Sequence, residues 1–177
     1  VKACFLLYGP GTDNFAYIMK LLLARHAEAE SSTPDSERSL TEKGKSDARR
    51  MARVLRQTGW QFEEILCSPL RRTVQTAELY GAGLGTSAKN AVQAVPFLAP
   101  TADRTRAIEH LGEMGIRGAA LWVFHMPDVA EVASWLLGIP AASLYVTPGT
   151  IIALNLAFPV PGKAMLVWSM QPEHLPE

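Results

Sequence analysis

Arg25-His26 stands at the point where a short apolar run, residues 20–24, gives way to polar sequence. A neutral imidazole is a good nucleophile near neutral pH because its unperturbed pKa is about 6.5. The guanidinium beside it carries a fixed charge and a planar fork of donors that matches phosphate oxygens. This pairing suits an attack on phosphorus, but a dipeptide of this kind, taken alone, is far more often an ordinary surface pair.

A second candidate segment, residues 68–76, begins a predicted helix where another apolar strand ends. Ser68 is a suitable N-cap, and Pro69 after it suits the first helical position. The free N–H groups and the positive end of the helix dipole favour an anion there, and Arg72, one turn in, can reach back toward it. Arg71 is expected to point to solvent. Alone, the segment is more simply a capped helix with two solvated arginines.

His125 is the third candidate, because it follows the apolar run 119–124 and precedes another predicted helix. By itself it would be a structural histidine. With His26, Arg25 and Arg72 it completes a set of two imidazoles and two guanidiniums around one anion. That set predicts phosphoryl transfer through a histidine nucleophile, with no metal and no cofactor.

The elements that must position these residues alternate between strands and helices. The predicted helices span 41–59, 68–80, 103–114 and 127–137, and the predicted strands span 20–24, 64–67, 119–124, 150–158 and 163–170. Residues 81–100 are expected to form a loop, and the last two strands a hairpin-like return at the sheet edge. The alternation predicts an α/β layered fold with a largely parallel sheet, which binds ligands beyond the carboxyl ends of its strands.

The composition limits the classes of function. With 17 basic and 17 acidic residues, the chain offers no long-range attraction to nucleic acid or to an anionic membrane. Cys4 and Cys67 are too few for a disulfide framework, which favours a reducing, cytoplasmic compartment, and no apolar run approaches the ~20 residues of a membrane span. Residues 1–18 are expected to be an N-terminal extension, with Met19 as a possible natural start and 19–177 as a single domain.

Taken in this order, the motifs resemble the histidine phosphatase superfamily, and within it the small bacterial phosphohistidine phosphatases of the SixA type. The resemblance runs from Met19 to the C-terminus. It includes residues 35–44, which are similar to the family's Arg-x-Leu-Thr-x-x-Gly segment, and residues 168–172, which are similar to its ending. It implies a phosphoglycerate mutase-like three-layer α/β/α sandwich with a mostly parallel sheet and no large lid insertion.

The resemblance also implies roles for individual residues. His26 would become phosphorylated, Arg25 and Arg72 would hold the phosphate, and His125 would stabilise the transferring group. Further residues expected at the substrate are Arg38, Ser68 and Glu28. The substrates would be phosphohistidine-bearing proteins, namely bacterial phosphotransfer domains or phosphotransferase-system carriers.

The sequence departs from the family pattern at two places. Larger relatives often have glycine where this chain has Phe124, whose bulk would narrow the pocket or alter the setting of His125. Relatives that act on phosphate esters commonly supply a carboxylic acid after the second motif, where this chain has residues 96–98, Pro-Phe-Leu. Glu28 and Asp103 are the remaining candidates for a general acid.

The missing acid favours phosphohistidine as the substrate, because an imidazole leaves readily near neutral pH whereas an alkoxide needs a proton. The short interval between Thr76 and His125 leaves little room for an insertion that would cover the site as a lid. An open site suits a phosphoryl group carried on a protein surface. Two alternatives stay open. One is a phosphatase for small phosphate esters, and the other is a phosphoprotein-binding module that has lost turnover through Phe124.

Overall fold

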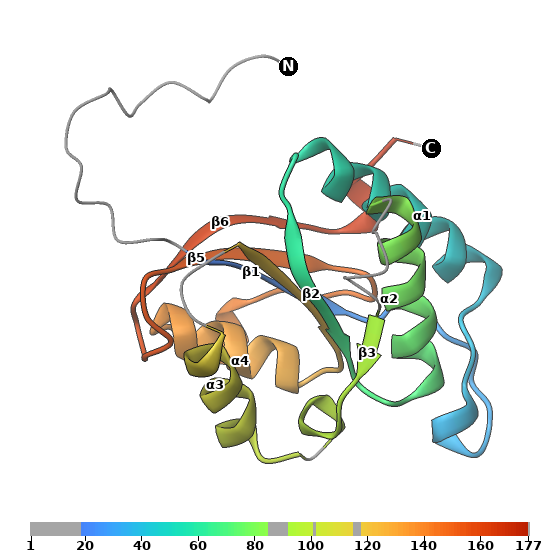
Figure 1. Ribbon diagram of the computed structural model, residues 1–177. Coiled ribbons are helices and arrows are strands. Elements are labelled where there is room, and N and C mark those ends of the chain that lie inside the picture. The colour runs from blue at the N-terminus through green and yellow to red at the C-terminus, as the bar shows by residue number, and fades with distance from the viewer. Residues whose placement is uncertain (1–18, 85–91, 101, 115–117, 177) are drawn as a thin grey trace.

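The fold is known from a computed structural model that describes residues 19–84, 92–100, 102–114 and 118–176 (Figure 1). Six strands form one sheet in the order β3-β2-β4-β1-β5-β6. In chain order they are β1 (Met19–Arg25), β2 (Phe62–Cys67), β3 (Val92–Ala94), β4 (Ala119–Phe124), β5 (Ile151–Leu156) and β6 (Ala164–Met170). The predicted N-terminal extension, residues 1–18, lies outside the described residues.

The sheet has a parallel part and an antiparallel edge. The pairs β1–β4, β2–β4 and β2–β3 are parallel, whereas β1–β5 and β5–β6 are antiparallel. This confirms the α/β fold and the hairpin-like return of the last two strands. In the register of β1 and β4, Arg25 pairs with Phe124, and the next residue of each strand is a histidine. Adjacent parallel strands therefore deliver His26 and His125 to the same edge of the sheet.

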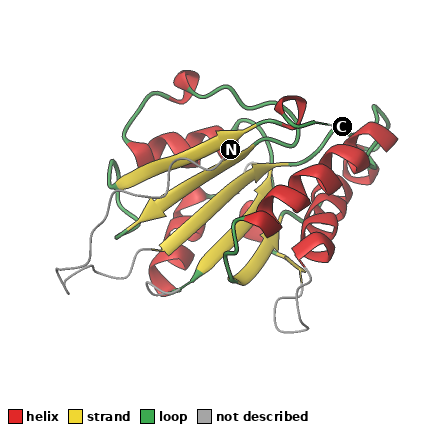
Figure 2. Cartoon of the chain, turned by 90° about the horizontal axis from the view of Figure 1, so that it is seen from above, coloured by secondary structure: helices red, strands yellow, loops and turns green. Residues whose placement is uncertain are grey.

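Helices cover both faces of the sheet, so that three layers result (Figure 2). On one face α1 (Glu42–Gln57) and α2 (Arg71–Leu84) pack against inward side chains such as Leu22 and Leu121. On the other face α3 (Arg104–Glu113) and α4 (Asp128–Leu137) pack against Leu21 and Trp122. Every residue of β4 is buried, as expected of a central parallel strand covered on both faces.

The predicted ends of α1 and α4 are confirmed. The Thr41 side chain accepts a hydrogen bond from the Gly44 N–H and so caps α1, whose C-terminal end is followed by Gly59 at φ +68°. The helix α4 ends at Gly138, which has φ +71° and adopts the left-handed conformation that glycine tolerates best. Gly115, expected to close α3, lies outside the described residues. In the described part of the chain, no helix has the length and apolar character needed to cross a membrane.

Two predictions about the middle of the chain are wrong. The helix α2 begins at Arg71 and not at Pro69, because the carbonyl that accepts from the N–H groups of Thr73 and Val74 is that of Leu70. The predicted loop 81–100 contains the last turn of α2 and the strand β3, which joins the edge of the sheet beside β2. Residues 85–91 of that loop lie outside the described residues.

Candidate active site

His26 and His125 lie side by side at the carboxyl ends of β1 and β4. Their ring centroids are 5.4 Å apart and the rings are tilted by 57°. Both side chains are buried, and the N–H of His26 donates to the carbonyl of Phe124 at 3.0 Å. The sheet register thus brings together two histidines that are 99 positions apart in the sequence, as the sequence motifs predict.

The backbone fixes the tautomer of His26. Its Nδ1 lies 2.8 Å from the carbonyl oxygen of Ala27, and because a carbonyl oxygen only accepts, Nδ1 must carry the proton. The lone pair of the neutral ring then resides on Nε2. A histidine held in this way presents one defined nitrogen as nucleophile.

Both imidazoles are held in the neutral form. Burial lowers the pKa of His26 to about 4, against the opposing effect of the Ala27 hydrogen bond, and the positive charges of Arg72, Arg25 and Arg38 lower it further. Burial also lowers the pKa of His125 to about 3, with the charges of His26 and Arg72 adding to the effect. At neutral pH the Nε2 lone pair of His26 is therefore available for attack without prior deprotonation.

Arg25 and Arg72 are each anchored at the tip of the side chain. Arg25 donates from Nη1 to the main-chain carbonyl of Val146 at 2.9 Å. Arg72 donates from Nη1 to the main-chain carbonyl of Asp35 at 2.8 Å and from Nη2 to the Asp35 carboxylate at 3.0 Å. In both arginines the inner Nε is buried and has no hydrogen-bond partner among the described residues.

His125 shares this property, because both of its ring nitrogens are buried without a hydrogen-bond partner in the described part of the chain. Buried donors are almost always paired in folded proteins, and a group of unpaired ones indicates a site for a ligand. An N–H of Arg25, an N–H of Arg72 and an N–H of neutral His125 all require an acceptor. A phosphoryl group carries several strong acceptor oxygens and a matching negative charge.

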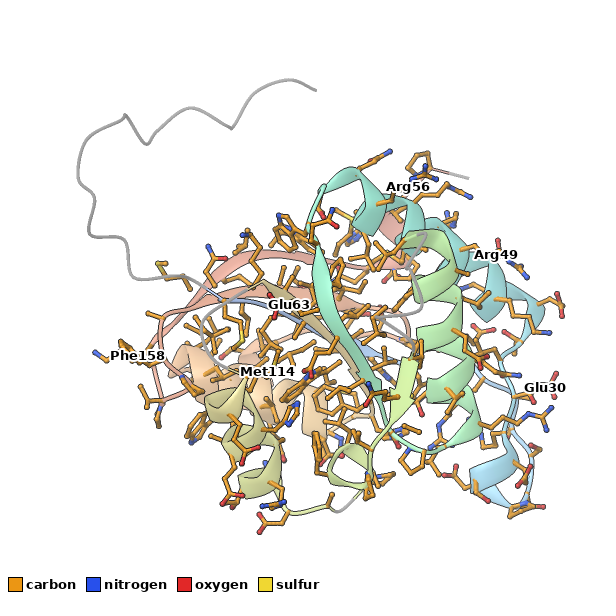
Figure 3. The ribbon with its side chains drawn as sticks, in the orientation of Figure 1. Glu30, Arg49, Arg56, Glu63, Met114 and Phe158 are labelled. Carbon is orange, nitrogen blue, oxygen red and sulfur yellow. The ribbon has the colours of Figure 1, made fainter. Side chains whose placement is uncertain are left out.

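Asp35 is the residue that sequence reasoning missed. It lies in a short 3₁₀ helix, Asp35–Glu37, and its carboxylate contacts Arg38 through Oδ1 at 3.0 Å as well as Arg72 through Oδ2. Arg38 also donates from Nε to the carbonyl of Glu30, which lies on the loop after β1 (Figure 3). The available sequence signal was a carboxylate three positions before Arg38, within the segment that resembles a family motif.

Hydrogen bonds from α2 position the loop that carries His26. The Ala27 N–H donates to Oγ1 of Thr76 at 3.1 Å, and the Leu40 N–H donates to Oε1 of Gln75 at 2.8 Å. From the other side, the Gly149 N–H donates to the His26 carbonyl at 3.0 Å. Two polar residues of the segment 68–76, Gln75 and Thr76, therefore fix the backbone of the loop that follows His26.

The other residues expected at the site are placed differently. Ser68 is fully buried, and its backbone joins the ends of β2 and β4. Arg71 is exposed, as expected, and lies 3.8 Å from Glu37. Glu28 accepts a hydrogen bond from the Thr41 hydroxyl at 2.8 Å and lies 3.7 Å from Lys43, so its carboxylate is engaged at the start of α1.

Asp103 and Phe124 also have structural roles, one as a helix cap and the other in the core. Asp103 caps α3 by accepting from the Thr105 N–H, and these hydrogen bonds lower the pKa of its carboxyl group. A carboxyl group held ionised in this way cannot donate a proton as a general acid. The Phe124 ring belongs to the core between the sheet and the α3–α4 layer. No group of three or more histidine, cysteine, aspartate or glutamate side chains in the described residues could hold a metal ion.

Comparisons with known proteins agree with this geometry. A family model described as histidine phosphatase superfamily (branch 1) matches residues 21–93. The solved structure of the protein histidine phosphatase SixA complexed with tungstate superimposes with a TM-score of 0.77 at 27% identity, covering 87% of this chain and 97% of that one. The chain is thus similar to the histidine phosphatase superfamily over residues 21–93, and to the solved SixA structure over most of its length. Its fold is of the compact, SixA-like form without a large insertion.

Other proteins resemble the chain in fold or in part of the sequence. A phosphoserine phosphatase mutant from Entamoeba histolytica, in complex with phosphoserine, has a TM-score of 0.67 at 15% identity, with 89% of this chain and 99% of that chain covered. A curated but uncharacterised protein from Picosynechococcus is 42% identical over 67 residues, which cover 36% of this chain. That match spans 41% of the length of the Picosynechococcus protein.

Proposed function

We propose that this chain is a phosphatase that hydrolyses phosphohistidine on proteins by way of a phosphorylated His26. The observation that carries the proposal is the set of buried nitrogens of Arg25, Arg72 and His125, which have no partner among the described residues. The His125 ring lies 5.4 Å from that of His26, and the charges of both arginines act on His26. The match to the histidine phosphatase family model and the binding of tungstate, an oxyanion, by the similar SixA protein support the proposal.

In the first half-reaction, the Nε2 lone pair of His26 attacks phosphorus, a new P–N bond forms and the P–N bond of the substrate breaks. The substrate ring, which carries a proton on its other nitrogen, leaves as neutral imidazole with the electron pair of that bond, and His26 keeps its proton on Nδ1. The guanidiniums and His125 donate to the oxygens on which negative charge concentrates. In the second half-reaction, water attacks phosphorus, the bond to His26 breaks and inorganic phosphate is released.

The nature of the nearby carboxylates favours phosphohistidine over phosphate esters. Hydrogen bonds from Arg38 and Arg72 hold the pKa of the Asp35 carboxyl below its usual value, so that Asp35 is ionised at neutral pH. Asp103 caps a helix and Glu28 is engaged by Thr41. An ester would need a proton on its leaving alkoxide, whereas an imidazole with a pKa of about 6.5 leaves without a strong acid.

The decisive experiment compares donors. The purified chain is incubated with a phosphohistidine-bearing carrier domain, and in parallel with phosphoserine and p-nitrophenyl phosphate, and phosphate release is measured. We expect the phosphohistidine signal to disappear fastest. His26→Ala should be inactive, and His174→Ala, a change in the exposed C-terminal segment, should match wild type. Ester hydrolysis without loss of phosphohistidine would overturn the substrate assignment.

A further inference from the structure

We infer that Asp35 is a positioning residue that orients Arg72 for phosphate, an inference that rests on the proposed function. The two residues are 37 positions apart, and their contact joins the 3₁₀ helix Asp35–Glu37 to the first turn of α2. Nothing in the sequence motif around Arg72 requires such a partner. The argument depends on which nitrogens of the guanidinium Asp35 occupies.

The guanidinium of Arg72 has five N–H bonds in one rigid plane, one on Nε and two on each terminal nitrogen. Asp35 accepts from both terminal nitrogens, through its main-chain carbonyl at 2.8 Å and its carboxylate at 3.0 Å. Two such contacts fix the plane and its rotation. The Nε–H, buried and without a partner among the described residues, is thereby directed at a defined point. We assign that point to a phosphate oxygen.

Asp35 is itself held on its outer side. Its second carboxylate oxygen accepts from Arg38 at 3.0 Å, and Arg38 donates from Nε to the Glu30 carbonyl. The Asp35 side chain is 61% exposed, whereas that of Arg72 is 6% exposed. The carboxylate therefore contacts the buried guanidinium from the solvent side and does not occupy its Nε–H.

The charge of Asp35 also suits this role. Arg25, Arg38 and Arg72 carry three positive charges near His26, and the Asp35 carboxylate neutralises one of them. The remaining charge of +2 matches a phosphate dianion. Removal of the carboxylate charge should therefore disturb the direction of Arg72 without weakening the attraction of the site for phosphate.

The test separates orientation from binding. Asp35→Asn keeps the shape of the side chain but can accept from only one of the two arginines. We expect kcat for phosphohistidine hydrolysis to fall about 10- to 100-fold, because misdirected donors cost rate more than affinity. The dissociation constant for inorganic phosphate should change by less than about fivefold, since an exposed charge contributes little to binding. The matched control is Glu37→Gln, in the same turn, whose carboxylate lies 3.8 Å from the exposed Arg71; this variant should match wild type.

A spectroscopic readout on the wild-type chain makes the inference independent of turnover. Titration with inorganic phosphate should shift the Nε–H signal of Arg72 in a proton–nitrogen NMR spectrum, and the carboxyl carbon signal of Asp35 should stay near its starting position. In Asp35→Asn the Arg72 signal should broaden or move before phosphate is added. Movement of the Asp35 carboxyl signal to that of a free aspartate would show displacement by phosphate and overturn the inference.

The outcomes distinguish this inference from the proposed function. Wild-type kcat in Asp35→Asn would overturn the positioning role and leave the phosphohistidine phosphatase standing. A phosphate-induced shift of the Arg72 Nε–H in a chain that does not hydrolyse phosphohistidine would support the positioning role and count against the proposed function. Loss of phosphate binding in a folded Asp35→Asn protein would show that Asp35 acts in binding, and so would also overturn the inference.

Discussion

At the scale of single residues, the candidate site depends on imidazoles kept neutral and guanidiniums kept fixed. A buried His26 next to three arginines loses its proton more easily than a free imidazole, and its backbone hydrogen bond selects the nitrogen that can attack. The resting structure therefore already contains the reactive protonation state. Burial has the largest effect on the pKa of His26. The neutral, reactive form of the ring therefore depends on its buried position.

The pKa of His26 gives a direct prediction. An NMR titration of the ring carbon signals should give a midpoint near pH 4, well below the value of about 6.5 for an exposed histidine. Inorganic phosphate should raise the midpoint, because a nearby anion stabilises the protonated ring. A midpoint near 6.5 in the free protein would contradict the buried, arginine-flanked environment.

The two consecutive arginines of α2 provide a matched pair of variants. Arg72→Ala should slow formation of the acid-labile phosphoenzyme by about 100-fold, the rate equivalent of the ~3 kcal/mol that one preorganised donor contributes to a transition state. Arg71→Ala should have almost no effect, because the Arg71 side chain is exposed and its ion pair within the described residues is the 3.8 Å contact with exposed Glu37. Rapid-quench measurement of the phosphoenzyme tests both. Equal effects of the two substitutions would contradict the assignment of Arg72 to the site.

At the scale of elements, α1 approaches the loop after His26 so closely that only glycine fits at the contact. A Cβ atom added at Gly44 would lie 2.1 Å from the carbonyl oxygen of Glu28. That oxygen also accepts from the Thr41 N–H, so it cannot easily move away. Gly44 thus sets the distance between α1 and the loop that follows His26.

Alanine substitutions at two helical glycines should therefore have opposite effects. Gly44→Ala should lower the free energy of unfolding by about 1–3 kcal/mol, the usual cost of overpacking. Gly112→Ala, in α3 where nothing lies within 4 Å of an added Cβ, should raise it by about 0.5–1 kcal/mol. Urea denaturation measures both. A Gly44→Ala protein as stable as wild type would show that the contact yields without cost.

The elements that the sequence predicted well are those with strong local signals. The buried run of β4 and the capped helix α1 are confirmed, because uninterrupted apolar residues and a Thr cap specify them locally. The strand β3 was missed because three residues carry no periodic pattern and depend on β2 for their hydrogen bonds. The start of α2 was placed two residues early because an apparent cap of Ser68 and Pro69 carried the local signal.

The candidate site was predicted in part. The pairing of His26 and His125 follows from strand ends, which the sequence reveals. The interaction of Asp35 with Arg72 depends on how a loop folds back on α2, which no local pattern specifies. His110 illustrates the same limit. Its place in the predicted helix 103–114 does not reveal that it lies 3.0 Å from Glu64, which also accepts from the Trp122 indole.

At the scale of the whole molecule, the buried histidines couple folding to pH. Their pKa values of about 4 and about 3 in the fold lie below the value near 6.5 of an unfolded chain. Between these values the unfolded chain binds more protons, so acidification favours unfolding. The contribution to stability is full above pH 6.5 and is lost progressively as the pH falls toward 4.

Unfolding measurements across this range should show the effect. The free energy of unfolding should fall as the pH drops from 6.5 to 4, by up to about 1.4 kcal/mol per pH unit for each ring. The double variant His26→Asn with His125→Asn should show a shallower dependence, whereas His174→Asn, an exposed substitution, should keep the wild-type slope. An unchanged slope in the double variant would indicate that other groups control acid unfolding.

The hydrogen bond from Arg25 to the main chain of Val146 affects how similar proteins should be compared and engineered. The acceptor is the main-chain carbonyl of Val146, which every amino acid possesses. No point mutation at position 146 deletes that oxygen, so the hydrogen bond itself does not depend on which residue stands there, whereas the packing of the buried Val146 side chain in the core does. An alignment of related sequences would therefore not reveal this hydrogen bond. Only a shift of the backbone, by insertion, deletion or strain, would release the guanidinium.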